Sequence, residues 1–147
     1  MKFEETVIKL FELSEDLRST RDRLVSLAKA INDPERLYLV GSVKEIDIVR
    51  ATLLGQYELL DTSRIVKPEY LAAYYTRRLE ILEMTRRQLS VHVEEIVAIG
   101  RATQAAEVLK EIERASNQVR WSMDSLDAVI GILKDRTMGE GSDRTLH

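Results

Sequence analysis

The chain of 147 residues is 44% hydrophobic and 32% charged, with a formal net charge of −3. This length suits a single domain, and the mildly acidic balance excludes a general electrostatic attraction to nucleic acid. The absence of cysteine excludes disulfide bonds, thiolate metal sites and a cysteine nucleophile. No apolar run approaches the roughly 18–20 residues of a membrane span, and the N-terminal segment mixes acids with its apolar residues, unlike a signal peptide. We therefore expect a cytoplasmic protein that neither inserts into membranes nor takes nucleic acid as its partner.

Long helices are expected from the start of the chain, because helix-breaking residues are scarce, with 6 glycines and 2 prolines. Apolar residues at steps of three and four predict a first helix over about residues 3–31 and, from Pro34, a second helix to about Asp61. Gly41 and Gly55 either weaken this second helix or allow another helix to approach it closely. The predicted core stripes are Leu10, Leu13, Leu17, Thr20, Leu24, Leu27 and Ile31 in the first helix, and Leu39, Val43, Ile46, Arg50, Leu53, Tyr57 and Leu60 in the second.

The second half of the chain predicts two more helices and a tail. Pro68 begins the third helix, Gly100 is the expected C′ residue that ends it, Thr103 is the expected N-cap of the fourth helix, and the fourth helix covers about residues 104–135. The alternative is one uninterrupted helix from Pro68 to about residue 115. Residues 137–147 combine glycines with mixed charges and are expected to form a disordered tail outside a domain of residues 1–136. The core stripes are Tyr75, Leu79, Leu82, Arg86, Leu89, Val93 and Ile96, then Ala105, Leu109, Ile112, Ser116, Val119, Met123, Leu126, Ile130 and Leu133.

These four helices of similar length predict an all-α fold. Short connections make sequential helices antiparallel, and apolar steps of three and four are typical of helices packed at about +20°. The expected architecture is therefore an up-down-up-down antiparallel four-helix bundle. The alternative is a set of extended helical hairpins that assemble as an oligomeric coiled coil, which would follow if the third helix continued past Gly100.

Each predicted stripe carries a polar interruption, and these interruptions share one height. Counted from the connections at about 1.5 Å per residue, four of them fall near the middle of the bundle: Thr20, Arg50, Arg86 and Ser116. A buried guanidinium needs an acid, a carbonyl, water or a ligand, so this layer predicts a pocket for a small carboxylate or phosphate. Two alternatives stay open: the arginines extend to the surface beside the core, or they form an ion-pair layer that fixes helix register.

The sequence offers few catalytic candidates. With 2 histidines and no cysteine, neither a zinc pattern nor the ligand set of a di-iron bundle is present, so we expect no metal and no cofactor. The segment Arg87-Gln-Leu-Ser-Val-His92 is similar to the Arg-x4-His motif of HEPN-family ribonucleases, which are also helical bundles. The resemblance implies that Arg87 would stabilise charge on an RNA phosphate while His92 takes part in proton transfer. The alternative is that His92 lies on the flank of the third helix without a catalytic role.

Exposed clusters offer surfaces for a partner. Trp121 lies off the fourth stripe and forms a second apolar strip with Ala128 and Ile132, which either binds a partner or closes the groove to a neighbouring helix. Further apolar positions outside the stripes either widen the core face or form a dimer interface: Leu37, Val40, Val49, Leu54, Val108, Val129 and Ile132. At the start of the third helix, an aromatic and basic cluster either binds RNA or an acidic partner or wedges the end of the bundle: Tyr70, Tyr74, Tyr75, Arg77 and Arg78.

Wide apolar stripes without a catalytic constellation favour a non-catalytic interaction or adaptor protein, whose partner is another protein or a second copy of itself in a homodimer. The first alternative is a ligand-sensing bundle that binds a small anion at the polar layer. The second alternative is a HEPN-like ribonuclease that uses Arg87 and His92.

Overall fold

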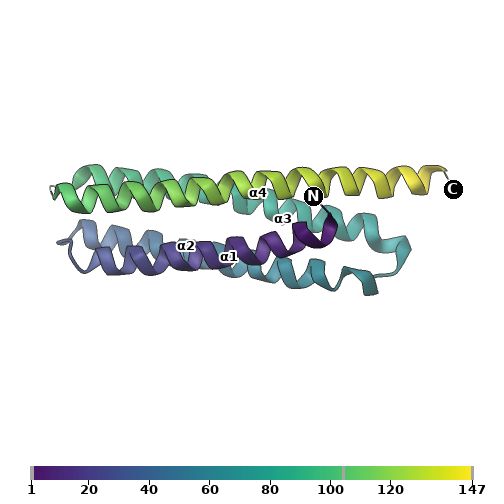
Figure 1. The fold of residues 1–147 in the computed structure, drawn as a ribbon, viewed down its shortest axis with the longest axis horizontal. Helices are drawn as coiled ribbons and strands as arrows, with labels where there is room; N and C mark the ends of the chain where they lie inside the picture. Colours follow the sequence, from purple (N-terminus) through teal and green to yellow (C-terminus); the bar gives the residue numbers. More distant parts are fainter. Residues whose placement is uncertain (1, 104, 147) are drawn as a thin grey trace.

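The computed structural model describes the backbone of residues 2–103 and 105–146, and the side chains of these residues up to 137. Four α-helices make up nearly all of this range: α1 (Phe3–Ala28), α2 (Glu35–Asp61), α3 (Leu71–Ala102) and α4 (Ala106–Leu146). Two short 3-10 helices, η1 (Ser63–Ile65) and η2 (Pro68–Tyr70), lie in the connection between α2 and α3. Consecutive helices run antiparallel, and both α1 and α3 pack against α2 and α4 (Figure 1). The predicted up-down-up-down four-helix bundle is confirmed.

The core is formed mainly by the apolar stripes predicted from the sequence, but the assignment of Ala105 to the fourth stripe is wrong, since this residue is exposed and lies before α4. One chain encloses these stripes, so an oligomeric coiled coil is not needed to cover them. Val49 and Val129, two of the apolar positions outside the stripes, are also buried. Each fully buried Leu or Ile side chain contributes roughly 1.5–3 kcal/mol relative to an exposed one. The largest fully buried side chains are Leu10, Leu13, Leu17, Leu24, Leu39, Ile46, Leu53, Leu60, Leu82, Leu89, Ile96 and Ile112.

The break between α3 and α4 lies close to where the sequence placed it. Helix α3 ends at Ala102, Thr103 is extended with φ −78° and ψ 144°, and its Oγ1 donates a hydrogen bond of 2.8 Å to the carbonyl of Gly100. The alternative of one helix running to about residue 115 is therefore wrong. Gly100 itself lies within α3 at a negative φ, so its expected role as the C′ residue is wrong. Thr103 is the C-cap of α3 and not the N-cap of α4, which begins at Ala106. A Cβ added at Gly100 would lie 2.8 Å from Cγ2 of Ile112, so this glycine allows α3 and α4 to approach closely.

Aromatic side chains join three helices at the end of the bundle that holds the α2–α3 connection. Tyr75 of α3 is only 3% exposed, and its ring meets that of Phe3 of α1 edge to face, with 5.8 Å between the ring centroids. The guanidinium of Arg136 in α4 lies 4.0 Å from the Phe3 ring centroid and 5.6 Å from that of Tyr75. Tyr74 donates a hydrogen bond of 2.7 Å to the carbonyl of Leu59. These contacts support the interpretation of a wedge at the bundle end for Tyr74 and Tyr75, whereas Tyr70 is 59% exposed.

The terminal helices differ in length from their predicted extents. Helix α1 ends at Ala28, and α4 continues to Leu146. The side chains after residue 137 and the whole of residue 147 lie outside the described residues, so the disordered tail expected for residues 137–147 stays a prediction.

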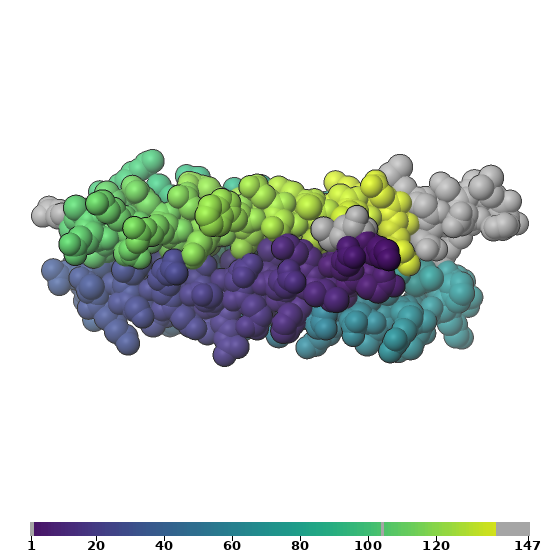
Figure 2. Space-filling view, viewed as in Figure 1, coloured from purple at the N-terminus to yellow at the C-terminus, as the bar shows by residue number. Residues whose placement is uncertain are grey.

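Helices α1 and α4 lie side by side along one face of the molecule (Figure 2). Over the described range, no helix combines the length and the hydropathy needed to span a membrane.

Candidate functional site

The two hydroxyls of the predicted polar layer are buried and satisfied within the bundle. Thr20 Oγ1 lies 3.1 Å from the carbonyl of Asp16 and 3.3 Å from Oε1 of Gln118, which links α1 to α4. Ser116 donates a hydrogen bond of 2.9 Å to the carbonyl of Ile112 in its own helix. Because each hydroxyl already has a partner, neither needs a bound ligand.

The two arginines of the predicted layer reach opposite sides of the bundle. Arg50 is 19% exposed in its side chain, and its Nε lies 2.8 Å from Oδ1 of Asp47 on the side facing α1. Arg86 is 28% exposed, and its Nε lies 2.9 Å from Oδ1 of Asp127 on α4. Among the described residues, no hydrogen bond or ion pair joins the four layer residues to one another. The structure therefore does not bring the four residues into contact with one another, because long arginine side chains extend past the core to surface carboxylates. Binding of a small anion at these residues stays a prediction.

Two separate hollows lie beside the layer residues. One of about 230 Å³ lies in the α1–α4 groove and is lined by Thr20, and another of about 270 Å³ lies between α3 and α4 and is lined by Ser116. Neither Arg50 nor Arg86 lines either hollow. Neither of these two hollows therefore offers the anion-pocket hypothesis a space in which the two arginines could meet.

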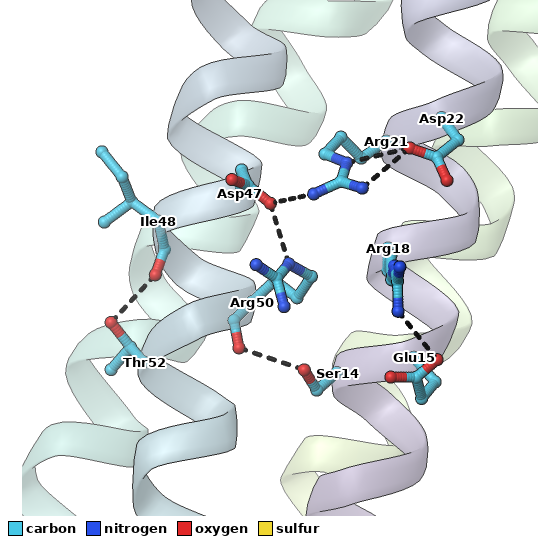
Figure 3. A network of polar contacts seen from close by, with 9 residues as sticks. All are labelled: Ser14, Glu15, Arg18, Arg21, Asp22, Asp47, Ile48, Arg50 and Thr52. Atoms are coloured by element: carbon cyan, nitrogen blue, oxygen red, sulfur yellow. Dashed lines mark hydrogen bonds and ion pairs between the residues drawn. The ribbon is translucent and has the colours of Figure 1, made fainter.

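A charged network joins α1 to α2 around Asp47 (Figure 3). Asp47 Oδ1 lies 2.8 Å from Arg50 Nε and 2.6 Å from Arg21 Nη1, and Arg21 also contacts Asp22 at 2.9 Å. These hydrogen bonds, from Arg50 first and then Arg21, lower the pKa of Asp47. Nearby, Ser14 donates a hydrogen bond of 3.2 Å to the backbone carbonyl of Arg50. The network explains why an arginine is tolerated in the α2 stripe.

We expect Asp47→Asn to lower the free energy of unfolding by about 0.5–1 kcal/mol at pH 7, a size set by solvent screening because the Asp47 side chain is 41% exposed. The carboxylate's pKa is lowered in the folded state. Its stabilisation is therefore present above the ordinary carboxyl pKa of about 3.9 and is lost as the pH falls through the lower folded value. Urea unfolding between pH 7 and pH 2 would measure the difference between wild type and variant.

A matched control for this prediction is Glu15→Gln, since Glu15 lies 3.9 Å from Arg18 with both side chains about half exposed. It should change the free energy of unfolding by less than Asp47→Asn does. A difference between wild type and Asp47→Asn that stays constant down to pH 2 would contradict the role given to the carboxylate.

The Arg-x4-His pair does not share one face of α3. A helix turns about 100° per residue, so five residues separate the two side-chain directions by about 140°. Arg87 is exposed, whereas the His92 side chain is 12% exposed and lies against α2, with Nδ1 2.9 Å from Oε2 of Glu45. One chain therefore does not bring the two groups onto a common phosphate, and the ribonuclease function stays a prediction without support from this geometry.

A titratable cluster surrounds His92 between α2 and α3. His92 Nδ1 lies 2.9 Å from Glu45 Oε2 and 3.7 Å from Glu95 Oε2. Ser42 donates a hydrogen bond of 3.3 Å to the same oxygen of Glu95. The sequence signal for this cluster was the spacing of three residues between His92 and Glu95, but the contribution of Glu45 depends on how α2 and α3 are aligned. An imidazole with two carboxylates is a donor set that can hold a metal ion.

The outer face of α2 carries an apolar line that the bundle leaves uncovered. Ile48, at its centre, is 66% exposed and points away from the side of α2 that holds Asp47 and Arg50 (Figure 3). Gly41 and Gly55 lie one heptad on either side of it, and a Cβ added at either glycine would meet nothing within 4 Å. We call this line the α2 outer stripe: Leu37, Gly41, Ile48, Gly55 and Leu59.

The predicted partner strip on α4 is largely open to solvent. Trp121 is 68% exposed, Ala128 is exposed and Ile132 is half-buried. Trp121 also lines the hollow in the α1–α4 groove. A role for this strip in partner binding stays a prediction.

Comparison of the chain with protein-family models, with curated proteins and with solved structures found no match. Its function therefore has to be inferred from its own residues.

Proposed function

We propose that this protein is a non-catalytic helical-bundle module that binds a second copy of itself through the outer face of α2. The observation that carries the proposal is the symmetry of the α2 outer stripe about Ile48. Gly41 and Gly55 lie seven residues before and after Ile48, and Leu37 and Leu59 lie eleven residues before and after it. These five positions have the same order of residue types when the helix is read in either direction, whereas the flanking positions four residues from Ile48 differ, with Lys44 before it and Thr52 after it.

This symmetry suits a two-fold axis through Ile48. In a dimer with such an axis the same patch is used by both copies, and the two α2 helices run antiparallel. Ile48 then meets Ile48 of the second copy, each Gly41 faces a Gly55, and each Leu37 faces a Leu59. Small residues opposite one another let two helix backbones approach closely, with the larger apolar side chains packing around them.

The glycines support the same proposal from the energetics of a single chain. Within a helix, glycine is less stable than alanine by roughly 0.5–1 kcal/mol. Gly41 and Gly55 have negative φ angles and open space around them, so the fold of one chain gives no reason for either glycine. A closely packed second helix supplies that reason. On the neighbouring helix α3, the exposed side chains of Met84 and Val91 add further apolar surface.

We expect wild-type protein to be dimeric and the Ile48→Glu variant to be monomeric when mass is measured by sedimentation velocity over a dilution series. Ile48 is exposed in one chain, so a glutamate there should leave the fold intact while placing two carboxylates on the two-fold axis. Trp121→Glu is the matched control, because Trp121 is 68% exposed and Ile48 is 66% exposed. A wild-type monomer, or dissociation by Trp121→Glu and not by Ile48→Glu, would overturn the proposal.

A double variant, Gly41→Ala with Gly55→Ala, separates the two roles of the glycines. In the Ile48→Glu background it should raise the melting temperature, because alanine favours the helix and meets no neighbour. In the wild-type background it should weaken dimerisation by about tenfold or more, equivalent to about 1.4 kcal/mol, because added methyl groups separate the helices. Unchanged or tighter dimerisation would contradict close approach at these positions.

A further inference from the structure

The groove between α2 and α3 holds a converging set of side chains outside the α2 outer stripe. Glu45 projects from α2, and His92 and Glu95 project from adjacent turns of α3. One ligand atom from each lies within 4.8 Å of the others. In the part of the chain that the structure describes, no other three histidine or acidic side chains converge in this way.

From this geometry we infer that Glu45, His92 and Glu95 bind a divalent transition-metal ion of the Zn²⁺ class. One imidazole nitrogen with two carboxylate oxygens is a donor set that suits Zn²⁺ and its first-row neighbours. Four-coordinate Zn²⁺ holds nitrogen and oxygen ligands at about 2.0–2.2 Å, which places neighbouring ligand atoms about 3.3–3.6 Å apart. The distances from His92 Nδ1, 2.9 Å to Glu45 Oε2 and 3.7 Å to Glu95 Oε2, lie on either side of that spacing. Small side-chain rotations would therefore admit an ion.

The imidazole nitrogen that faces the carboxylates is not satisfied by the protein. Nδ1 of His92 is buried, and despite the short distance to Glu45 Oε2 it makes no hydrogen bond of acceptable geometry to any described residue. Buried polar atoms without a partner are uncommon in folded proteins. A metal ion between Nδ1 and the two carboxylates would satisfy this nitrogen and offset the repulsion between the two negative charges.

The surroundings supply the other parts of a metal site. Buried Ser42 donates a hydrogen bond to Glu95 Oε2, which would hold that carboxylate in place as residues behind metal ligands commonly do. A shallow groove of about 450 Å³ opens beside the cluster, and Glu45, Glu95 and Ser42 line it together with Leu37 and Gly41 of the α2 outer stripe. This groove gives an ion a path from solvent and leaves room for water as a fourth ligand.

Titration of the protein with Zn²⁺ by isothermal calorimetry tests the inference. The chain's other histidine, His147, is replaced by alanine in every sample, so that it contributes no binding. We expect about one ion per chain, with affinity lowered at least about 100-fold by His92→Gln or Glu95→Gln and about tenfold by Ser42→Ala. The matched control is Glu94→Gln, an exposed glutamate next to Glu95, which should bind as wild type does.

Titration with Co²⁺ adds a readout of geometry, because the intensity of its visible absorption reports four-coordinate binding. Circular dichroism of each variant checks that the helices remain folded. Absence of Zn²⁺ binding by the wild type, or equal binding by His92→Gln and Glu94→Gln, would overturn the inference. All three ligands come from one chain, so about one ion per chain should bind at protein concentrations both below and above that at which the dimer forms. The metal-binding measurement can therefore be interpreted whether or not the protein dimerises.

Discussion

Replacing Tyr75 by alanine is expected to lower the free energy of unfolding by about 3–5 kcal/mol, the range for removing a large buried aromatic side chain. Tyr75 is 3% exposed and joins helices that are far apart in sequence, through the ring of Phe3 in α1 and the guanidinium of Arg136 in α4. Its loss would leave a cavity and remove the surface on which both groups rest. Urea unfolding in the Ile48→Glu background, followed by circular dichroism, would measure the change without a contribution from dimerisation.

Two further substitutions isolate the source of that loss. Tyr75→Phe keeps the ring and removes a hydroxyl that lies 3.4 Å from Ser63 Oγ, near the upper limit for a hydrogen bond, so it should cost less than about 1 kcal/mol. Tyr70→Ala removes a tyrosine that is 59% exposed, and its effect should lie within about 0.5 kcal/mol of zero. If Tyr70→Ala and Tyr75→Ala proved equally destabilising, the wedge described for Tyr75 would be incorrect.

Gly100→Ala is expected to destabilise the protein by up to about 2 kcal/mol, although alanine is the better helix former. The added Cβ would lie 2.8 Å from Cγ2 of Ile112 and 3.3 Å from Cδ1 of Leu109. Overpacking of this kind costs about 1–3 kcal/mol, whereas the gain in helix propensity is only about 1 kcal/mol. Because Cγ2 is attached to the rigid β-branch of a buried side chain, it cannot rotate away cheaply.

Gly131→Ala provides the opposite result for comparison with Gly100→Ala. Gly131 also lies inside a helix, but a Cβ there would meet nothing within 4 Å, so the substitution should stabilise by about 0.5–1 kcal/mol. Combining Gly100→Ala with Ile112→Leu removes the β-branch and should recover part of the loss, which a double-mutant cycle would quantify. Stabilisation by Gly100→Ala alone would show that α3 and α4 can separate at no cost.

The sequence predicted the bundle well because the spacing of apolar residues is a property of each helix by itself. Leu10, Leu17 and Leu24 repeat at intervals that place them on one face whatever the neighbouring helices do, and all three are fully buried. The approximate position of the break was also a local signal, but the sequence assigned Thr103 to cap the fourth helix, whereas its backbone and hydroxyl close α3. By contrast, the reason for Gly100 depends on Ile112 in the next helix, so its close packing could not be predicted from local sequence.

The predicted polar layer shows that counting residues along a helix does not give the direction of its long side chains. Heights along the bundle follow from the number of residues, but the direction of a long side chain does not. Arg50 and Arg86 occupy stripe positions, yet each extends to a carboxylate at a different groove, Asp47 on α2 and Asp127 on α4. The cluster around His92 also could not be predicted from one helix alone. The register between α2 and α3 brings Glu45 close to His92 and Glu95, and no motif in either helix contains all three residues.

The contact between α1 and α4, here called the α1–α4 seam, costs more chain entropy than the contacts between consecutive helices. Three of the four helix contacts join helices that follow one another, across connections of residues 29–34, 62–70 and 103–105. The α1–α4 contact instead closes a loop through residues 29–105. Since the entropy lost on closing a loop grows with its length, this seam opposes folding more than the others do. The Thr20–Gln118 hydrogen bond and the stacking of Arg136 on Phe3 lie across it. They therefore stabilise the contact whose formation restricts the chain most.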